Sequence, residues 1–338
     1  MLRSHLGIVL HTGFKMDLPD ESPYQRIEEM ALTAERLGYE YAFSYDHLLS
    51  YPDPSFPILE PWTVMPALAR ATRRIRLGTL VSCAAFRSPI QLAKIATTMD
   101  VISEGRTELG IGAGWYETEF ARSGNENFGV RAQLFDEYIQ VLNGLLSGAE
   151  VNFDGRFFKM RSARILPTPT QDSIPVWVGA TKPMMLRTIA KHANRWNLRG
   201  TPEYCKTERE LLNSYLEKQG RRTDSVTDSV YLQVFYDKNR QNAMEYMRKA
   251  LSPAQPLSTR VAGAIRNPSR VVDFIKAKSG VMGTDHPVAS NVVGNGEDCV
   301  RALSEYAQIG VKYMFLYLAG IDTPAQLETF GDDVAQHL

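Results

Sequence analysis

The chain has 338 residues, of which 44% are apolar and 22% charged, the composition of an ordinary globular protein. Lysine and arginine together number 38, as do aspartate and glutamate, so the formal net charge is zero and no basic field exists to attract nucleic acid. No stretch approaches the ~18 consecutive apolar residues that would cross a membrane. Cys83, Cys205 and Cys299 are too few and too far apart for a disulfide framework or a zinc knuckle, which indicates a reducing compartment. We expect a cytoplasmic protein.

Short β-rich runs alternate with longer amphipathic stretches along the chain. In the first such pair, an apolar run at 6–10 precedes a helical apolar pattern over 24–37, and Gly38 supplies the expected C-terminal stop. Ser88 and Pro89 are the residue types expected at an N-cap and at the first position of a further helix. Strands are predicted at 6–10, 40–44, 75–81, 106–111, 175–178, 195–198, 229–236 and 312–317, and helices at 24–37, 62–71, 90–102, 131–146, 183–192, 203–219, 241–250 and 298–309.

The predicted strands, most of them apolar on both faces, indicate a parallel sheet that is covered all round. At this length and without a linker, a closed (β/α)8 TIM barrel fits better than an open doubly wound sheet, so we expect one α/β domain over 1–338. Two insertions interrupt the alternation. A β-hairpin is expected at about 150–166, after the fourth helix, and a longer excursion at about 251–295, after the seventh strand, with a helix near 268–278.

An acid and an imidazole, Asp46 and His47, directly follow the second predicted strand. Chemistry in a parallel barrel takes place at the carboxyl ends of the strands, and a neutral imidazole there can give or take a proton near pH 7. Asp46 or a backbone group would fix its tautomer. The alternative is that Asp46 caps the next element and His47 is a satisfied polar group under a loop. Residue types alone favour the capping interpretation, and the position after a buried strand at the catalytic end makes the two about equal. No HxH or HExxH spacing supports a metal site.

Two glycine-containing turns follow later strands. The segment GRTELGIGAGW lacks the third glycine of a Rossmann fingerprint. Its Gly112 and Gly114 either let a flat ligand lie close to the backbone or merely shape a turn. Gly179, Ala180 and Thr181 precede a helix N-terminus, where backbone N–H groups and the helix dipole suit a phosphate, although an ordinary turn has the same composition.

Five stretches of the chain resemble the luciferase-like oxidoreductase superfamily, and within it the branch that uses the deazaflavin coenzyme F420. They are YAFSYDHLL, IRLGTLVSCAAFRSPIQLAKIATTMDVISEGRTELGIGAGWYETEF, RAQLFDEYIQVLNGLL, IPVWVGAT and VGNGEDCVRALSEYAQIGVKYMFLYL. They are spread over nearly the whole chain. The resemblance implies a bacterial-luciferase-like barrel with the cofactor ring at its C-terminal mouth. It also implies hydride transfer between F420 and a small organic substrate, and a homodimer.

The resemblance also assigns roles to particular positions. His47 would be the acid/base or positioning residue near the reacting carbon, and Asp46 would touch the cofactor. Leu80 and Val81 match the place of a non-proline cis peptide that supports the back face of the ring. The remaining implied cofactor contacts are Gly112 and Gly114 at the edge of the ring, Gly179, Ala180 and Thr181 at the phosphate, and Arg199 at the phosphate or the substrate.

The chain departs from the family pattern in two places. The resemblance implies that the family's glucose-6-phosphate dehydrogenases have a glutamate proton donor at the position where this chain has Trp115. The resemblance therefore does not extend to that substrate. Glu117 and Glu119 follow the commoner pattern and either serve elsewhere or cap the turn. The frequent Ala-Asp-Gly-Trp signature appears here with Asn194 and Arg195 at its centre, which bears on how the cofactor's tail is bound.

Two other functions stay open at this point. The first is an FMN-dependent monooxygenase on the same barrel, in which a true flavin reacts with oxygen; the Asp-His pair favours the deazaflavin. The second is a non-catalytic barrel that binds a ligand, which the altered signature and Trp115 would suit. No feature of the sequence indicates the substrate.

Overall fold

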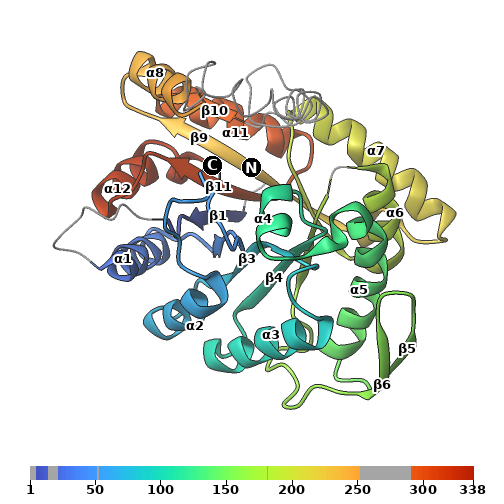
Figure 1. The fold of residues 1–338 in the computed structure, drawn as a ribbon. Helices are drawn as coiled ribbons and strands as arrows, with labels where there is room; N and C mark the ends of the chain where they lie inside the picture. Colours follow the sequence, from blue (N-terminus) through green and yellow to red (C-terminus); the bar gives the residue numbers. More distant parts are fainter. Residues whose placement is uncertain (1–4, 14–21, 52, 181, 252–290) are drawn as a thin grey trace, which may run out of the picture.

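A closed barrel of eight parallel strands forms the centre of the computed structural model, which describes residues 5–13, 22–51, 53–180, 182–251 and 291–338 (Figure 1). The strands are β1 (His5–Leu10), β2 (Tyr41–Ser44), β3 (Arg76–Cys83), β4 (Thr107–Gly112), β7 (Val176–Gly179), β8 (Arg195–Leu198), β9 (Thr227–Tyr236) and β11 (Tyr313–Ala319). β9 pairs in parallel with both β8 and β11 and so closes the ring. Every predicted strand is present, and the predicted (β/α)8 fold is confirmed.

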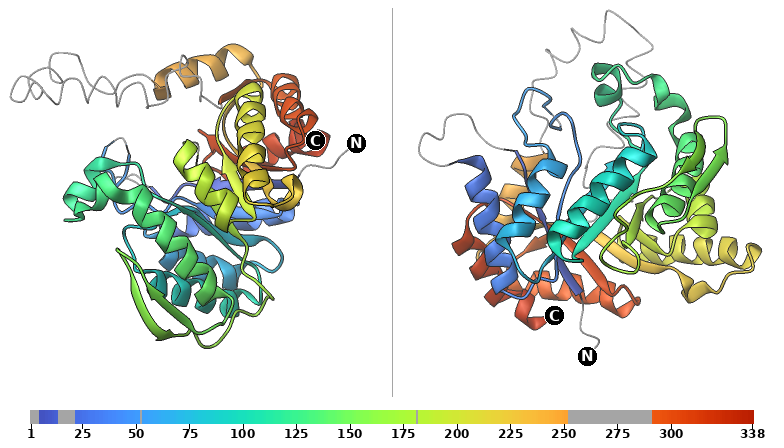
Figure 2. Two further views of the ribbon diagram at one scale, coloured as in Figure 1. Left: turned by 90° about the vertical axis from the view of Figure 1, so that its right-hand side faces the viewer. Right: turned by 90° about the horizontal axis from the view of Figure 1, so that it is seen from below.

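Helices surround the barrel, as the two further views in Figure 2 show. Their buried apolar side chains pack against the strands in one hydrophobic core. The predicted helices are α1 (Pro23–Arg36), α2 (Pro61–Ala71), α3 (Pro89–Ser103), α5 (Arg131–Leu146), α6 (Pro183–His192), α7 (Pro202–Lys218), α8 (Arg240–Leu251) and α11 (Gly296–Gln308). Ser88 caps α3 by accepting a hydrogen bond from the Gln91 N–H at 3.4 Å, and Gly38 ends α1 with a φ of +89°. Two α-helices of the described part of the chain were not predicted, α4 (Glu117–Arg122) and α12 (Pro324–Asp333). None of the described helices is long and apolar enough to cross a bilayer.

Bulky side chains fill the inside of the barrel. Phe43 and Phe315 are fully buried there, with ring centroids 4.7 Å apart, and Trp177 contacts Phe315 at 5.3 Å. Nearer the amino end, the buried carboxylate of Glu108 pairs with Arg76 and accepts a hydrogen bond from Trp177 Nε1 at 2.7 Å. Because this packing closes the lower part of the barrel, a ligand can enter only at the carboxyl ends of the strands.

The first predicted insertion is a β-hairpin, made of β5 (Val151–Asp154) and β6 (Lys159–Ala163). Most of the second insertion, including the helix predicted near 268–278, lies outside the described residues. Its described end contains β10 (Asn291–Gly294), a strand that was not predicted. β10 pairs in parallel with the carboxyl half of β9, beyond the point where β8 ends, and so raises the barrel wall there.

Candidate functional site

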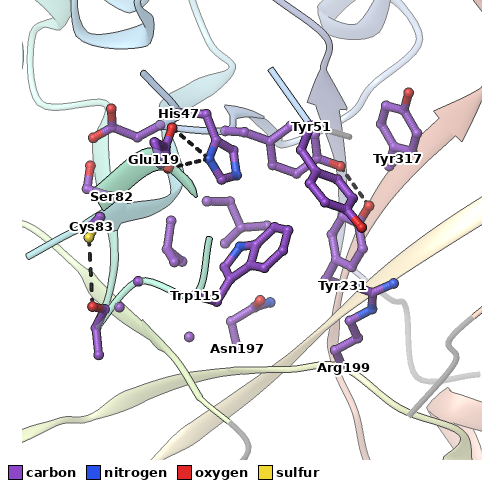
Figure 3. A pocket seen from close by; sticks show the side chains of 18 of the residues that line it. His47, Tyr51, Ser82, Cys83, Trp115, Glu119, Asn197, Arg199, Tyr231 and Tyr317 are labelled. Atoms are coloured by element: carbon purple, nitrogen blue, oxygen red, sulfur yellow. Dashed lines mark hydrogen bonds and ion pairs between the residues drawn. The ribbon is translucent and has the colours of Figure 1, made fainter. Parts of the chain in front are cut away.

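A large cavity of about 1930 Å³ opens at the carboxyl ends of the barrel strands. The predicted site residues that the structure describes all line it: Asp46, His47, Leu80, Val81, Gly112, Gly114, Gly179, Ala180 and Arg199. Thr181 lies outside the described residues. Residues predicted from the ends of five separate strands therefore lie around one cavity, part of which Figure 3 shows from close by.

His47 is held by a carboxylate on a different element, the short helix α4. Its Nδ1 lies 3.1 and 3.0 Å from the two carboxylate oxygens of Glu119, which is only 2% exposed (Figure 3). Glu119 also accepts hydrogen bonds from the backbone N–H groups of Leu48 and Leu49. An ionised carboxylate only accepts, so Nδ1 carries the proton and Nε2 is the nitrogen left free for chemistry.

Asp46 does not fix the tautomer of His47, contrary to the first of the two possibilities considered from the sequence. Its carboxylate is buried and forms a two-pronged ion pair with Arg87, at 2.6 and 3.1 Å. Trp62 Nε1 donates a third hydrogen bond to Asp46 at 3.1 Å, and its distance to Ser82 Oγ is 2.9 Å. Burial raises the pKa of Asp46, and the adjacent Arg87 opposes that rise. Asp46 thus ties the end of β2 to the end of β3, and its contact with a cofactor stays a prediction.

The wall formed by the ends of β3, β4 and β7 presents backbone to the cavity. The Leu80–Val81 peptide is cis, as the resemblance predicted, and the pairing of β3 with β4 shifts register at this point. A Cβ at Gly112 would lie 3.0 Å from Val81 Cγ2, and one at Gly179 would lie 3.1 Å from both Val81 methyl carbons. Glycine on the two neighbouring strands therefore makes room for Val81, and leaves a wall with few projecting side chains.

Gly114 is where this wall is packed most tightly, and we expect Gly114→Ala to lower the free energy of unfolding by about 2–4 kcal/mol. Its φ is +86°, and a Cβ there would lie 2.5 Å from Cys83 Sγ. Gly124 is the matched control because it has a φ of +70° with nothing within 4 Å of a Cβ, so Gly124→Ala should cost only about 1 kcal/mol. Chemical denaturation of both variants measures the difference, and equal losses would contradict the packing argument.

The opposite wall carries polar and aromatic side chains from β2, β8, β9 and β11. The hydroxyls of Tyr45 and Tyr231 are 2.6 Å apart, and burial raises the pKa of both phenols, so both stay protonated at neutral pH. The Arg199 guanidinium lies 5.4 Å from the centre of the Tyr231 ring. Gln233 and Tyr317 complete this side. The sequence contained one signal for it, a glutamine within the otherwise apolar run VYLQVFY.

Aromatic rings surround His47 at the mouth of the cavity. Trp115 stands edge-on to the imidazole at a centroid distance of 5.8 Å, and Tyr51 lies 4.9 Å from Trp115. Tyr116 stacks on Trp115 at 5.5 Å and lies 5.2 Å from Tyr51. Trp115 is still 54% exposed, an unusual state for so large an apolar side chain. The rings can cover a bound ligand and exclude water from His47.

The N-terminus of α6 opens toward the cavity, and no side chain among the described residues caps it. The carbonyl oxygen of Ala180 accepts a hydrogen bond from Trp196 Nε1 at 2.8 Å, which fixes the turn between β7 and α6. Neither Asn194 nor Arg195 lines the cavity; Arg195 instead lies over Trp177 inside the barrel, with 4.8 Å between its guanidinium carbon and the ring. The presence of Asn194 and Arg195 in the family signature therefore does not disturb the turn between β7 and α6.

Two other kinds of site find little support among the cavity residues. Burial raises the pKa of the Cys83 thiol to about 12, so it is a poor nucleophile at neutral pH. Within the described part of the chain, no group of three or more histidine, cysteine, aspartate or glutamate side chains is arranged to hold a metal ion.

Comparisons with known proteins agree with this geometry. Residues 4–313 match the family model described as luciferase-like monooxygenase. The F420-dependent glucose-6-phosphate dehydrogenase of Amycolatopsis mediterranei (strain U-32) is 26% identical over 350 residues, which cover 98% of this chain and 99% of the relative. The coenzyme F420-dependent tetrahydromethanopterin reductase of Methanopyrus kandleri superposes with a TM-score of 0.76 at 23% identity, covering 99% of both chains. A long-chain alkane monooxygenase superposes with a TM-score of 0.75 at 17% identity, covering 99% of this chain and 91% of the other.

Proposed function

The chain belongs to the luciferase-like monooxygenase family, and on that premise we propose that it is an oxidoreductase that transfers a hydride between coenzyme F420 and a small organic substrate. The observation that carries the proposal is an imidazole, His47, fixed by a buried carboxylate beside a wall of bare backbone. A relative named as F420-dependent, aligned over nearly the whole chain, supports the choice of cofactor.

The residues present fit a flat ring with a phosphate-bearing tail. Leu80, Val81, Gly112 and Gly114 would hold the ring, because their wall projects few side chains into the cavity. The uncapped N-terminus of α6, with Gly179 and Ala180 before it, would hold the phosphate through backbone N–H groups. When bound, the cofactor supplies the carbon that gives or accepts the hydride.

The chain's own contribution would be orientation, exclusion of water and one proton. His47 would exchange that proton with the substrate at Nε2, since Glu119 occupies Nδ1. Glu119 would also stabilise the imidazolium that forms when Nε2 takes up a proton. Trp115 and Tyr51 would cover the reacting groups, which strengthens every electrostatic interaction beneath them. The homodimer and the cytoplasmic location expected from the sequence stay predictions.

A titration with the two rival cofactors tests the proposal. We expect F420 to quench the protein fluorescence, or to have its own quenched, at micromolar or lower concentration, and FMN to bind at least tenfold more weakly. Tight FMN binding with no F420 binding would overturn the choice in favour of an FMN-dependent monooxygenase. Binding of neither would favour a non-catalytic barrel.

A further inference from the structure

A cation and an unpaired amide oxygen lie together on the cavity wall opposite the proposed site of the cofactor ring. We define the β8–β9 wall as Arg199, just after β8, and Tyr231 and Gln233 on β9. We propose that this wall is an anion-binding subsite for the substrate, and that the substrate is an organic anion whose carboxylate or phosphate pairs with Arg199. The inference rests on the proposed function, which gives the bare-backbone wall of the same cavity to the cofactor.

Arg199 has no carboxylate partner. It forms no ion pair in the part of the chain that the structure describes, and its buried Nε has no hydrogen-bond acceptor there. Its close contact is the face of the Tyr231 ring. The two buried acids of the cavity are already engaged, Asp46 with Arg87 and Glu119 with His47. A partly buried guanidinium without an anion is costly, so a ligand that supplies one is bound favourably here.

Asp53, a third acid that lines the cavity, does not neutralise Arg199 either. Asp53 is bound by Ser55, whose backbone N–H and hydroxyl donate to Asp53 Oδ1 at 2.9 and 2.6 Å. Those hydrogen bonds lower the pKa of Asp53, and the positive charge of Arg122 lowers it further. The positive charge of Arg199 therefore reaches the cavity with little opposition, and a planar fork of N–H donors matches a carboxylate or a phosphate.

Gln233 supplies a second, independent sign of a ligand. It is only 6% exposed and lines the cavity, yet its Oε1 has no hydrogen-bond partner among the described residues. Residues two apart on a strand point to the same side, so Gln233 and Tyr231 face the cavity together. The pairing of Leu198 with Val230 sets Arg199 beside Tyr231. A substrate hydroxyl or N–H donating to Gln233 would satisfy the buried oxygen.

The β8–β9 wall is linked to His47 through tyrosine side chains. The Tyr45 ring lies 6.4 Å from the His47 ring, and its hydroxyl meets that of Tyr231 at 2.6 Å. In Figure 3, Arg199 and Tyr231 lie on one side of the cavity and Ser82 and Cys83 on the other, with His47 and Trp115 between. A substrate anchored at Arg199 thus extends toward His47 and toward the proposed ring site.

Calorimetric titration of the F420-loaded protein with three matched compounds tests the subsite. Benzoate and phenyl phosphate carry the two candidate anions, and benzamide is the neutral counterpart of benzoate. We expect at least one anion to bind the wild type, and Arg199→Gln to weaken that binding at least tenfold while the weaker binding of benzamide changes less than twofold. The anion that binds more tightly identifies the substrate class as carboxylate or phosphate.

Two further variants sharpen the result. Arg199→Lys keeps the charge without the planar fork and should retain part of the affinity. Lys249→Gln is the matched control, because it removes a cavity-lining cation that already pairs with Glu245, and should change anion binding less than twofold.

Three outcomes would overturn the inference: neither anion binds, an anion binds Arg199→Gln as tightly as the wild type, or Arg199→Gln weakens F420 instead of the anion. The last result would assign Arg199 to the cofactor. A wild type that fails to bind F420 would contradict the proposed function, and the F420 titration detects that failure separately from the anion data.

Discussion

Replacing His47 with alanine is expected to lower kcat at least 100-fold while F420 binding and the fold stay close to those of the wild type. A positioned acid or base accelerates proton transfer by about 10²–10⁴-fold, and His47 Nε2 is the free imidazole nitrogen of the Glu119 pair. The fold should persist because Glu119 keeps two backbone donors, the N–H groups of Leu48 and Leu49. Turnover is followed by the absorbance of F420, with an organic anion selected from a panel as substrate, and folding by circular dichroism.

His5→Ala is the matched control for that experiment. His5 lies at the amino end of β1, where its Nδ1 contacts Glu40 at 2.8 Å, so the variant removes an imidazole beside a carboxylate far from the cavity. Its kcat should match that of the wild type. Undiminished turnover in His47→Ala would remove His47 from the mechanism.

The sequence predicted the barrel and the place of the site for one physical reason. The alternation of buried strands with one-sided helices has few packing solutions, and in each of them the loops that follow the strands meet at one end. Asp46, Gly112, Gly179 and Arg199 are far apart in the chain, yet they could be assigned to one cavity because each follows a strand.

The hydrogen bonds and ion pairs between side chains of the cavity could not be predicted from the order of strands and helices. Glu119 and His47 are 72 positions apart, and both Asp46 and Glu119 were possible partners by residue type. Arg87 decides between them, because it occupies the Asp46 carboxylate. Gln233 lies in an apolar run that is buried on both faces of the strand. The residue types in that run therefore did not show which side chains face the cavity. Loop conformation and side-chain competition set these contacts, and neither leaves a periodic signal.

Glu119→Gln is expected to lower kcat about 100-fold with little loss of stability, because it exchanges the acceptor facing His47 for a donor. The amide oxygen can still accept from the N–H groups of Leu48 and Leu49, while its NH2 group turns toward His47 Nδ1. Nδ1 must then become an acceptor, and the proton of the neutral ring moves to Nε2. The nitrogen that faces the substrate is then in the wrong protonation state for a base. Nitrogen-15 NMR of the histidine ring reports this change of tautomer directly.

A larger structural effect should accompany removal of the whole carboxylate. Glu119→Ala leaves three part-buried donors without their acceptor, and should lower the free energy of unfolding by about 3 kcal/mol. Glu117→Gln is the matched control, since Glu117 lies exposed on the same short helix α4 two residues earlier. If Glu119 only braces the loop, Glu119→Gln should keep the wild-type tautomer and kcat. If it positions the base, kcat falls while the KM for F420 changes little, because the imidazole keeps its place and loses only its free Nε2 lone pair.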